Sequence, residues 1–292
     1  MSKSNKTSLE IAARALPAMP PFEPGCVWLV GAGPGDPGLL SLLAFHALGA
    51  ADDIVYDALV GEDILALAGA GAELHYAGKR GGKPSAKQGD ISDKLIDLAR
   101  AGRKVLRLKG GDPFIFGRGG EEALALAAAG VPFRLVPGIT AAVAGLAYAG
   151  IPITDRRVNS AVTFITGHES GGGPPAGLDW PALASGAPVL ILYMALKHLA
   201  WMAERLVAAG RAADTAVILI SKATLAGQKI VETNLARAAE DAAAANLEAP
   251  AIIAIGDVVG LRAALDPAAT PEARARAALE FLAVRAKEDT VP

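Results

Sequence analysis

Short apolar segments alternate with helix-like segments through residues 27–149, and this alternation constrains the fold more than any other feature of the chain. The apolar segments are predicted to be strands at 27–30, 53–56, 74–76, 105–108 and 133–136. The helices predicted between and after them are 39–48, 63–68, 91–101, 121–129 and 140–149. Repeated strand–helix units form mostly parallel sheets whose two faces are covered by helices. The sequence therefore predicts an α/β domain of this kind.

A second series of strands and helices follows the linker-like segment 150–157. Its predicted strands are 161–166, 189–194, 216–220 and 251–255, and its predicted helices lie near 196–209 and 234–245. We therefore expect two α/β domains with mostly parallel and mixed sheets, and a ligand site in the cleft between them. The predicted organisation is a flexible N-terminal arm at 1–24, an N-terminal α/β domain at 25–152, a C-terminal α/β domain at 153–262 and a helical tail at 263–292.

The composition argues against several classes of function. A formal net charge of -2 argues against a protein-wide attraction to nucleic acid or to an anionic membrane surface. Cys26 is the only cysteine, which excludes an intrachain disulfide and a cysteine metal cluster, and the four histidines lack metal-ligand spacing, so no metal is predicted. No apolar run has membrane-spanning length, and the N-terminus lacks the pattern of a signal peptide. We expect a cytoplasmic protein that binds neither membrane nor nucleic acid.

The glycine-rich run 107–122 carries the strongest signal of a ligand site. It follows a predicted strand and precedes a predicted helix, a geometry that presents backbone N–H groups and a helix N-terminus to a ligand. Gly110 and Gly111 permit close approach of the backbone to a ligand, and Asp112 supplies a hydrogen-bond acceptor. An ordinary turn is the alternative, because Gly-Asp-Pro is also a common turn sequence.

Two further loops resemble nucleotide-binding motifs only in part. The loop 31–36, Gly-Ala-Gly-Pro-Gly-Asp, has Asp36 where a dinucleotide-binding fingerprint requires its third glycine. A nicotinamide-dependent oxidoreductase with two α/β domains is therefore the competing hypothesis. The segment 79–85 fails as a phosphate-binding loop, because Ala77 and Pro84 stand where glycine and Ser/Thr are needed.

Charged residues near the predicted strand ends are candidates for chemistry. Asp57 follows the second strand at the carboxyl edge of the sheet, where ligands gather, although a turn or helix-capping role fits its position equally well. The basic residues that could line one cleft are Lys79, Arg80, Lys83, Arg107, Arg118, Arg156 and Arg157. Solvated surface charge is the alternative for this group.

Taken together, an ordered set of motifs resembles the tetrapyrrole methylase family over about residues 25–262. These motifs are 30–37 (VGAGPGDP), 56–60 (YDALV), 78–80 (GKR), the run 107–122, 137–141 (PGITA), 150–154 (GIPIT), 166–168 (TGH) and 193–194 (YM). The run 107–122 is similar to the uroporphyrinogen-methylating members of that family rather than to the later corrin-ring methylases or the diphthine synthases of the same fold.

The resemblance implies a reaction. Two methyl groups would pass from S-adenosylmethionine to ring carbons of uroporphyrinogen III, giving precorrin-2 by way of precorrin-1 for cobalamin or sirohaem biosynthesis. S-adenosylhomocysteine would be the by-product, no metal would be required, and the protein would be a homodimer. The substrate carries several carboxylates, which gives the basic residues a purpose that the net charge alone does not suggest.

The same resemblance implies roles for individual residues. Asp57 matches the proposed proton acceptor of the family, and Lys79 matches the proposed proton donor. The implied cofactor-binding residues are Pro34, Gly110, Gly111, Asp112, Ile115, Thr140, Ala141, Met194 and Ala223. The basic residues expected to meet the substrate carboxylates, together with Lys79, are Arg80, Arg107, Arg118 and Arg156.

Three positions depart from the family pattern. Asp155 stands where many relatives have histidine, Ala195 where many have glycine, and Ala223 at an expected glycine contact. A non-enzymatic ligand-binding protein is a third hypothesis, but the pairing of Asp57 with Lys79 argues against it, because a pure binder needs no proton-transfer groups.

Overall fold

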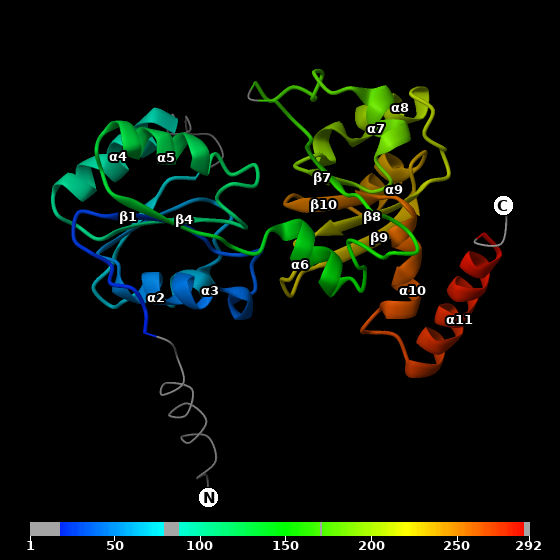
Figure 1. Ribbon diagram of the computed structural model, residues 1–292, viewed down its shortest axis with the longest axis horizontal. Coiled ribbons are helices and arrows are strands. Elements are labelled where there is room, and N and C mark those ends of the chain that lie inside the picture. Colours follow the sequence, from blue (N-terminus) through cyan, green and yellow to red (C-terminus); the bar gives the residue numbers. More distant parts are fainter. Residues whose placement is uncertain (1–17, 79–87, 170, 289–292) are drawn as a thin grey trace, which may run out of the picture.

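A parallel five-stranded sheet forms the first half of the molecule (Figure 1). The computed structural model describes residues 18–78, 88–169 and 171–288. The strands are β1 (Val27–Gly31), β2 (Asp53–Tyr56), β3 (Glu73–Tyr76), β4 (Val105–Lys109) and β5 (Phe133–Val136), in the order β3-β2-β4-β1-β5. All neighbouring strands run parallel, as the alternating pattern predicts. Every residue of β1 and β4 is buried, because helices cover both faces.

Alternate residues of β1 face different helices. Trp28 packs with α2 (Leu42–Ala50) and α3 (Glu62–Leu65) on one face, and Leu29 packs with α4 (Gln88–Arg100) and α5 (Gly119–Ala128) on the other. In Figure 1 these two pairs of helices lie on opposite sides of the sheet.

The helix α2 starts three residues later than the apolar pattern predicts. A 3-10 turn, η1 (Pro37–Leu39), comes first, and its N-cap Asp36 accepts a hydrogen bond from the Gly38 N–H. The Ser41 hydroxyl then caps α2 by accepting from the Ala44 N–H at 3.1 Å. Two capping side chains in succession therefore divide the predicted helix into a turn and a shorter helix.

The second sheet is mixed. Its strands are β6 (Thr163–Thr166), β7 (Leu190–Tyr193), β8 (Ala216–Ser221), β9 (Lys229–Asn234) and β10 (Ala251–Ile255), in the order β6-β7-β10-β8-β9. The pair β6–β7 is parallel and the other pairs are antiparallel. The helices α7 (Trp180–Gly186), α8 (Leu199–Ala208) and α9 (Ala238–Ala244) pack with one face, and η2 (Leu196–His198) leads into α8. The sequence patterns missed β9 and α7.

The helix α6 (Ala141–Tyr148) covers the opposite face of the second sheet. Its buried residues Ala142 and Leu146 pack with Ile191 of β7 and Ile218 of β8. The predicted boundary at residue 152 assigns this segment to the N-terminal domain. The hydrophobic packing instead changes from the first sheet to the second just after β5.

The C-terminal segment is helical, in agreement with the predicted tail. It contains η3 (Asp257–Leu261), α10 (Arg262–Leu265) and α11 (Pro271–Glu288), and α11 projects beside the second sheet in Figure 1. Arg262 anchors this segment through ion pairs with Glu232 at 2.7 Å and with Asp266 at 2.9 Å. Among the described residues, no helix has both the length and the apolar character that crossing a bilayer requires.

Candidate active site

Three glycine loops meet backbone to backbone at the carboxyl edge of the parallel sheet. They follow β1, β4 and β5, which are neighbouring strands. A Cβ atom on Gly138 would lie 2.2 Å from the Gly111 oxygen, and one on Gly31 would lie 2.5 Å from the Gly138 nitrogen. Gly33 and Gly111 also exchange two backbone hydrogen bonds, at 3.2 and 2.7 Å. Side chains are excluded from this junction, so a ligand placed here would meet mainly backbone groups.

The Asp112 carboxylate holds two of these loops together. Its Oδ1 accepts a hydrogen bond from the Phe114 N–H at 2.8 Å, and its Oδ2 accepts from the Gly138 N–H at 3.0 Å. Each oxygen thus accepts from a backbone group of the protein itself, one in the loop after β4 and one in the loop after β5. Asp112 therefore shapes the predicted ligand site by joining these two loops, apart from any direct contact with a ligand.

The loop after β4 reaches across to the second sheet. Ile115 packs against the core that α6 shares with β7, and the Phe116 ring lies 5.2 Å from the Tyr193 ring, centroid to centroid. Phe116 and Arg118 both have left-handed backbone, with φ of 51° and 60°. Two non-glycine residues in this uncommon conformation mark a tightly specified loop.

Thr140 and Met194 lie where the helix α6 meets the strand β7 of the second sheet. Thr140 is the buried N-cap residue of α6, and its Oγ1 lies 2.8 Å from the Tyr193 hydroxyl at the end of β7. Burial raises the pKa of Tyr193, and its hydrogen bond with Thr140 opposes that rise. Met194 follows with φ of 54° and a side chain that is 46% exposed, so it is not the core residue that an apolar strand end usually supplies.

The remaining predicted cofactor residues lie on the same loops or beside them. Pro34 and Ala141 are half-buried, and Gly110 is half-buried next to Gly111. Ala223 is buried at the end of β8, where its Cβ would lie 3.0 Å from a Cβ on Gly145 of α6.

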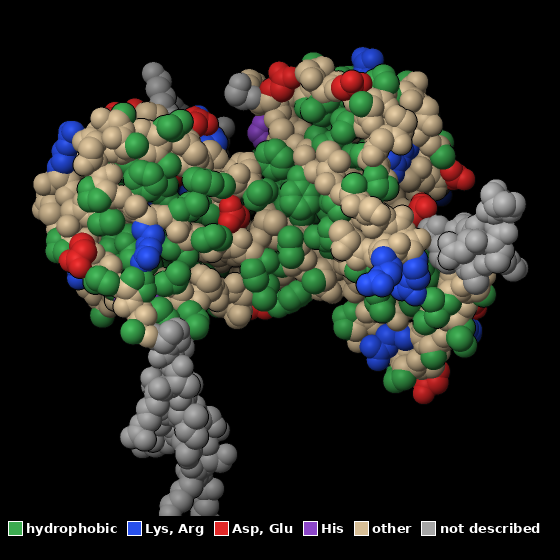
Figure 2. Space-filling model, viewed as in Figure 1, with side chains coloured by type: hydrophobic (Ala, Val, Ile, Leu, Met, Phe, Trp, Pro, Cys, Tyr) green, Lys and Arg blue, Asp and Glu red, His purple; other side chains and the backbone are tan. Residues whose placement is uncertain are grey.

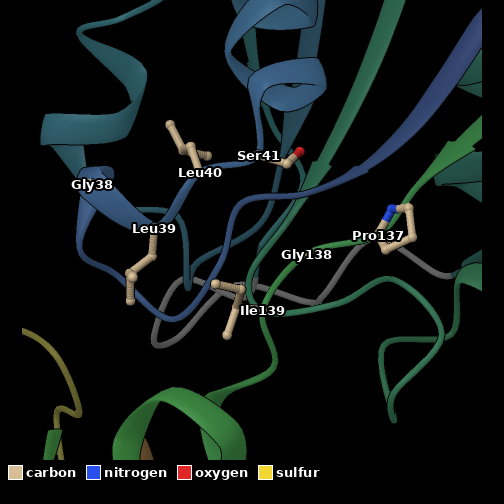
Figure 3. A pocket seen from close by; sticks show the side chains of 7 residues that line it. All are labelled: Gly38, Leu39, Leu40, Ser41, Pro137, Gly138 and Ile139. Atoms are coloured by element: carbon tan, nitrogen blue, oxygen red, sulfur yellow. The ribbon is translucent and has the colours of Figure 1, made fainter. Parts of the chain in front are cut away.

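A shallow apolar cavity of about 350 Å³ adjoins the glycine junction (Figure 3). It lies between the loops that follow β1 and β5 and is lined by Gly38, Leu39, Leu40, Ser41, Pro137, Gly138 and Ile139. Gly138 belongs both to this cavity and to the hydrogen bond with Asp112. One side of the cavity, 137–139, belongs to the motif 137–141, whereas the other side, 38–41, lies just beyond the motif 30–37.

Asp57 lies in the turn after β2, next to the glycine loop that follows β4. Its Oδ1 accepts a hydrogen bond from the Leu59 N–H at 3.1 Å, which is the turn role that the sequence left open. Leu59 packs so closely on Gly110 that a Cβ there would lie 2.5 Å from the Leu59 Cβ. The structure thus brings Asp57 close to the predicted cofactor glycines. Lys79 and Arg80 lie outside the described residues.

The described basic residues do not share one environment. Arg107 is buried, and its Nε donates to Glu122 at 3.0 Å, so it lies within the sheet rather than on the surface. Arg118 is exposed and makes a two-bond pair with Glu121, at 2.8 and 2.6 Å. Arg156 is exposed. Asp155, the departure from histidine, pairs with Arg157, whose hydrogen bonds lower the Asp155 pKa to about 2.

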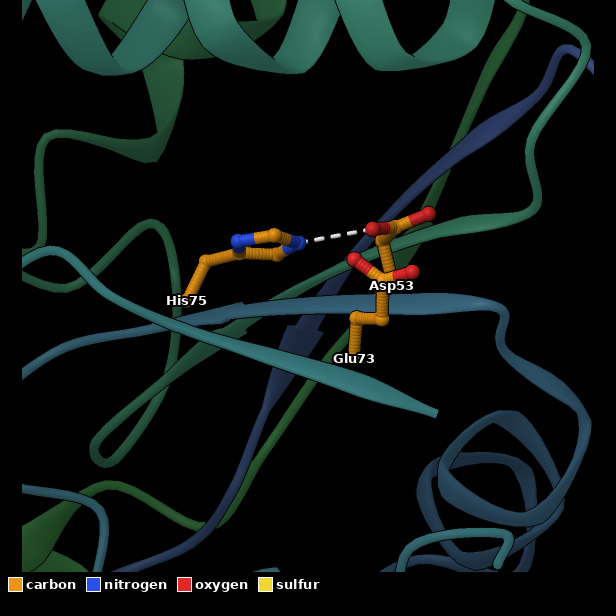
Figure 4. Close-up of side chains that lie close together, drawn as sticks. All are labelled: Asp53, Glu73 and His75. Atoms are coloured by element: carbon orange, nitrogen blue, oxygen red, sulfur yellow. Dashed lines mark hydrogen bonds and ion pairs between the residues drawn. The ribbon is translucent and has the colours of Figure 1, made fainter. Parts of the chain in front are cut away.

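A second charged cluster lies at the opposite edge of the parallel sheet (Figure 4). The Asp53 Oδ1 lies 2.6 Å from His75 Nε2, and its Oδ2 accepts from Arg103 Nε at 2.6 Å. The ammonium of Lys94 lies 3.0 Å from His75 Nδ1 and can only donate, so the ring proton lies on Nε2 and points to Asp53. Asp53, Glu73 and His75 lie close enough together to hold a metal ion. Both Asp53 oxygens, however, already pair with His75 and Arg103. We assign this cluster to stability.

Comparison with known proteins gives a consistent result. The sequence profile of the tetrapyrrole (corrin/porphyrin) methylases matches residues 26–239. A uroporphyrinogen-III C-methyltransferase from Sinorhizobium sp is 61% identical over 248 residues, which are 85% of this chain and 89% of the relative. A siroheme synthase from Pseudomonas fluorescens is 47% identical over 83% of this chain, which spans about half (52%) of that longer protein.

A solved structure is similar as well. The uroporphyrin-III C-methyl transferase from Thermus thermophilus, complexed with S-adenyl homocysteine, is 38% identical and superposes with a TM-score of 0.70. The match covers 80% of this chain and 98% of the other.

Proposed function

Because the chain belongs to the tetrapyrrole (corrin/porphyrin) methylases, we propose that it methylates uroporphyrinogen III at two ring carbons. Precorrin-1 would be the intermediate and precorrin-2 the product, for cobalamin or sirohaem biosynthesis. The structural observation that carries the proposal is the convergence of the family motifs at one place. The loops after β1, β4 and β5 pack backbone to backbone, and the loop after β4 reaches Tyr193 of the second sheet.

The co-substrate of the proposed reaction is S-adenosylmethionine, which supplies a methyl group on a positively charged sulfur. The protein's task is to align an electron-rich pyrrole carbon with that methyl group and to exclude water. One sulfur–carbon bond breaks as one carbon–carbon bond forms, and the methylated ring then loses a proton. The reaction needs no metal ion.

The proposed cofactor site combines backbone and apolar contacts. Backbone groups of Gly110, Gly111 and Asp112 would hold the polar parts of the cofactor. Apolar surface would come from Pro34, Ile115, Ala141 and Met194, with Thr140 at the start of α6. The buried Ala223 would contact the cofactor through its backbone. The 46% exposure of Met194 supports this assignment, because a methionine at the end of a buried strand is ordinarily covered.

We assign proton transfer to Asp57 and Lys79. Asp57 suits the acceptor role because its turn packs on Gly110 beside the cofactor loop. The assignment of Lys79 rests on the sequence motif, as does a substrate contact by Arg80. Arg118 and Arg156 are exposed and suit the substrate carboxylates, whereas Arg107 is committed to Glu122 inside the fold.

The oligomeric state and the domain boundaries complete the proposal. We expect a cytoplasmic homodimer, and exposed apolar residues on the helices α5 and α6 support it. Leu124 is 73% exposed, Val143 45% and Ile139 38%. Figure 2 shows hydrophobic side chains gathered on the face of the molecule around α6. We propose two α/β domains along the chain, 25–152 and 153–262, with a terminal arm and tail; α6 belongs to the first by sequence and packs on the sheet of the second. Light scattering at micromolar concentration tests the dimer, and a monomer mass would contradict it.

A methyl-transfer assay tests the function directly. The protein is incubated with uroporphyrinogen III and S-adenosylmethionine labelled in its methyl group, and the methyl groups in the tetrapyrrole are counted by mass spectrometry. We expect a singly methylated intermediate followed by a doubly methylated product. Binding of S-adenosylhomocysteine is measured in parallel by calorimetry, with a nicotinamide cofactor as the control. A protein that binds the nicotinamide cofactor and transfers no methyl group would contradict the proposal.

A further inference from the structure

Two hydrogen bonds join the loop after β1 to the second half of the molecule. The Tyr148 hydroxyl, at the end of α6, donates to Asp36 Oδ2 at 2.6 Å. The Asp36 backbone N–H donates to Thr224 Oγ1 at 3.1 Å, in the loop after β8. These partners are 112 and 188 residues away along the chain. We infer that Asp36, Tyr148 and Thr224 form a latch that fixes the distance between the two walls of the cofactor site.

The position of the latch supports this role. Asp36 lies two residues after Pro34, and Thr224 directly follows Ala223, so the latch ties together two loops that are both proposed to meet the cofactor. Next to it, Gly35 faces Leu225 so closely that a Cβ on the glycine would lie 2.7 Å from Leu225 Cδ2. Gly35 has φ of 144°, which a side chain would rarely adopt. The inference rests on the proposed function, because the two loops are proposed to contact S-adenosylmethionine.

The loop after β8 is built for a defined position. Lys222 and Thr224 both have left-handed backbone, with φ of 50° and 69°, and this conformation is rare for a β-branched residue. The Thr224 N–H donates to Gln228 Oε1 at 2.7 Å, and the Lys222 ammonium pairs with Glu248 at 2.7 Å. Local contacts on both sides thus hold a strained turn that presents the Thr224 hydroxyl to Asp36.

The latch lies at the surface and depends on few contacts. Tyr148 is 40% exposed, and the Asp36 carboxylate has a second partner only in its own turn, the Gly38 N–H at 2.7 Å. The Tyr148 hydrogen bond lowers the pKa of Asp36, helped by the Gly38 N–H, and the same bond raises the pKa of Tyr148. Each shift favours the bonded pair of a carboxylate and a neutral phenol. A contact of this kind can hold the cleft without being needed for the fold.

Two conservative variants test the latch. Tyr148→Phe removes the hydroxyl that donates to Asp36 Oδ2. Thr224→Val removes the hydroxyl oxygen that accepts from the Asp36 N–H and keeps the β-branched shape. Thr215→Val is the matched control, because its hydroxyl donates to the Ala212 carbonyl at 2.7 Å just before β8, at the opposite end of that strand. The measurements are the dissociation constant for S-adenosylhomocysteine by calorimetry, the KM for uroporphyrinogen III, and the melting temperature.

The expected result separates positioning from stability. Loss of one hydrogen bond should raise the dissociation constant for S-adenosylhomocysteine by about threefold to tenfold in each latch variant. The KM for uroporphyrinogen III and the melting temperature should match those of Thr215→Val. Unchanged cofactor affinity in both latch variants would overturn the latch, as would a fall in melting temperature with no change in affinity. If the unmodified protein fails to bind S-adenosylhomocysteine, the proposed function fails instead.

Discussion

The Lys109 ammonium lies 3.2 Å from Oε1 of Glu122 in the interior, directly before the glycine loop that follows β4. Arg107 shares the same oxygen at 3.0 Å, so one buried carboxylate pairs with two buried cations. Burial lowers the pKa of Lys109, and the Arg107 charge lowers it further, while Glu122 and Asp57 oppose both effects. Glu122 of α5 thus offsets the positive charges of Arg107 and Lys109 in the second half of β4, just before the glycine loop.

Glu122→Gln should destabilise the fold severely, because it leaves two buried cations without their carboxylate. We expect the free energy of unfolding to fall by about 3–5 kcal/mol, measured by urea denaturation. Glu121→Gln is the control on the same helix. That exposed side chain pairs with the exposed Arg118, so its loss should cost no more than about 1 kcal/mol. An equal loss of unfolding free energy in the two variants would contradict a stabilising role for the buried ion pairs of Glu122.

Asp57→Asn should separate a proton acceptor from a turn former. Asparagine keeps the oxygen that accepts from the Leu59 N–H but cannot take a proton at neutral pH. We expect a folded protein that binds S-adenosylhomocysteine normally and methylates about a hundredfold more slowly, or worse. Asp63→Asn, an exposed change on α3, should leave the rate unchanged. A near-normal rate in the Asp57 variant would show that another group accepts the proton.

Arg118→Gln and Arg156→Gln should weaken tetrapyrrole binding without changing the affinity for S-adenosylhomocysteine. A well-formed charge-assisted hydrogen bond contributes about 1.5–3 kcal/mol, so each change should raise the KM for uroporphyrinogen III about tenfold or more. Steady-state kinetics measures this KM, with Arg237→Gln on the outer helix α9 as a control that should show no effect. A KM equal to that of the control would make both arginines ordinary surface residues.

Asp112→Ala should affect both folding and cofactor binding, since the carboxylate joins two loops of the site. The change removes the hydrogen bonds to the Phe114 and Gly138 N–H groups. We expect a loss of about 2 kcal/mol in unfolding free energy, together with weaker binding of S-adenosylhomocysteine. Calorimetry measures the affinity for S-adenosylhomocysteine, and urea denaturation measures the free energy of unfolding. If either quantity is unchanged in Asp112→Ala, the carboxylate does not serve both the loop junction and the ligand site.

Asp53→Asn should reduce stability in a way that depends on pH. Burial alone would raise the Asp53 pKa, but hydrogen bonds from His75 and Arg103 outweigh it, and the pKa in the folded state is lowered from 3.8. The ionised carboxylate therefore stabilises the fold above pH 3.8, and this contribution disappears as the pH falls through the lowered pKa. We expect a difference of about 1–3 kcal/mol from the unmodified protein at pH 7. Denaturation between pH 7 and acidic pH should show that difference shrinking, and a constant difference would contradict the ion pairing.

The centre of the parallel sheet could be predicted because β1, β2 and β4 are largely apolar and buried, and helical patterns separate the strands along the chain. The strand β9 was missed because it is an edge strand with exposed and half-buried residues, so hydrophobicity alone does not mark it. The latch partners Tyr148 and Thr224 were missed because their contacts with Asp36 depend on tertiary structure. Asp36 itself was visible as a break in the glycine pattern, and the structure explains the break, since its carboxylate caps η1 and binds Tyr148.

The burial of Arg107 could not be predicted from the sequence, for a different reason. Arginine in a motif next to a ligand loop suggests contact with an anion, and its neighbours Leu106 and Leu108 do not reveal which face of β4 it occupies. The partner that settles the matter, Glu122, lies 15 residues further on, in a helix whose first turn is acidic. An acidic residue at a helix start is usually explained by the helix dipole, so the pairing was not evident from sequence.

The chain crosses from the first sheet to the second through residues 137–140, which also form part of the site. A change of backbone conformation in these four residues would therefore alter both the relation between the two sheets and the shape of the glycine junction. The backbone packing at the junction opposes such a change, because a Cβ on Gly138 would already lie 2.2 Å from the Gly111 oxygen.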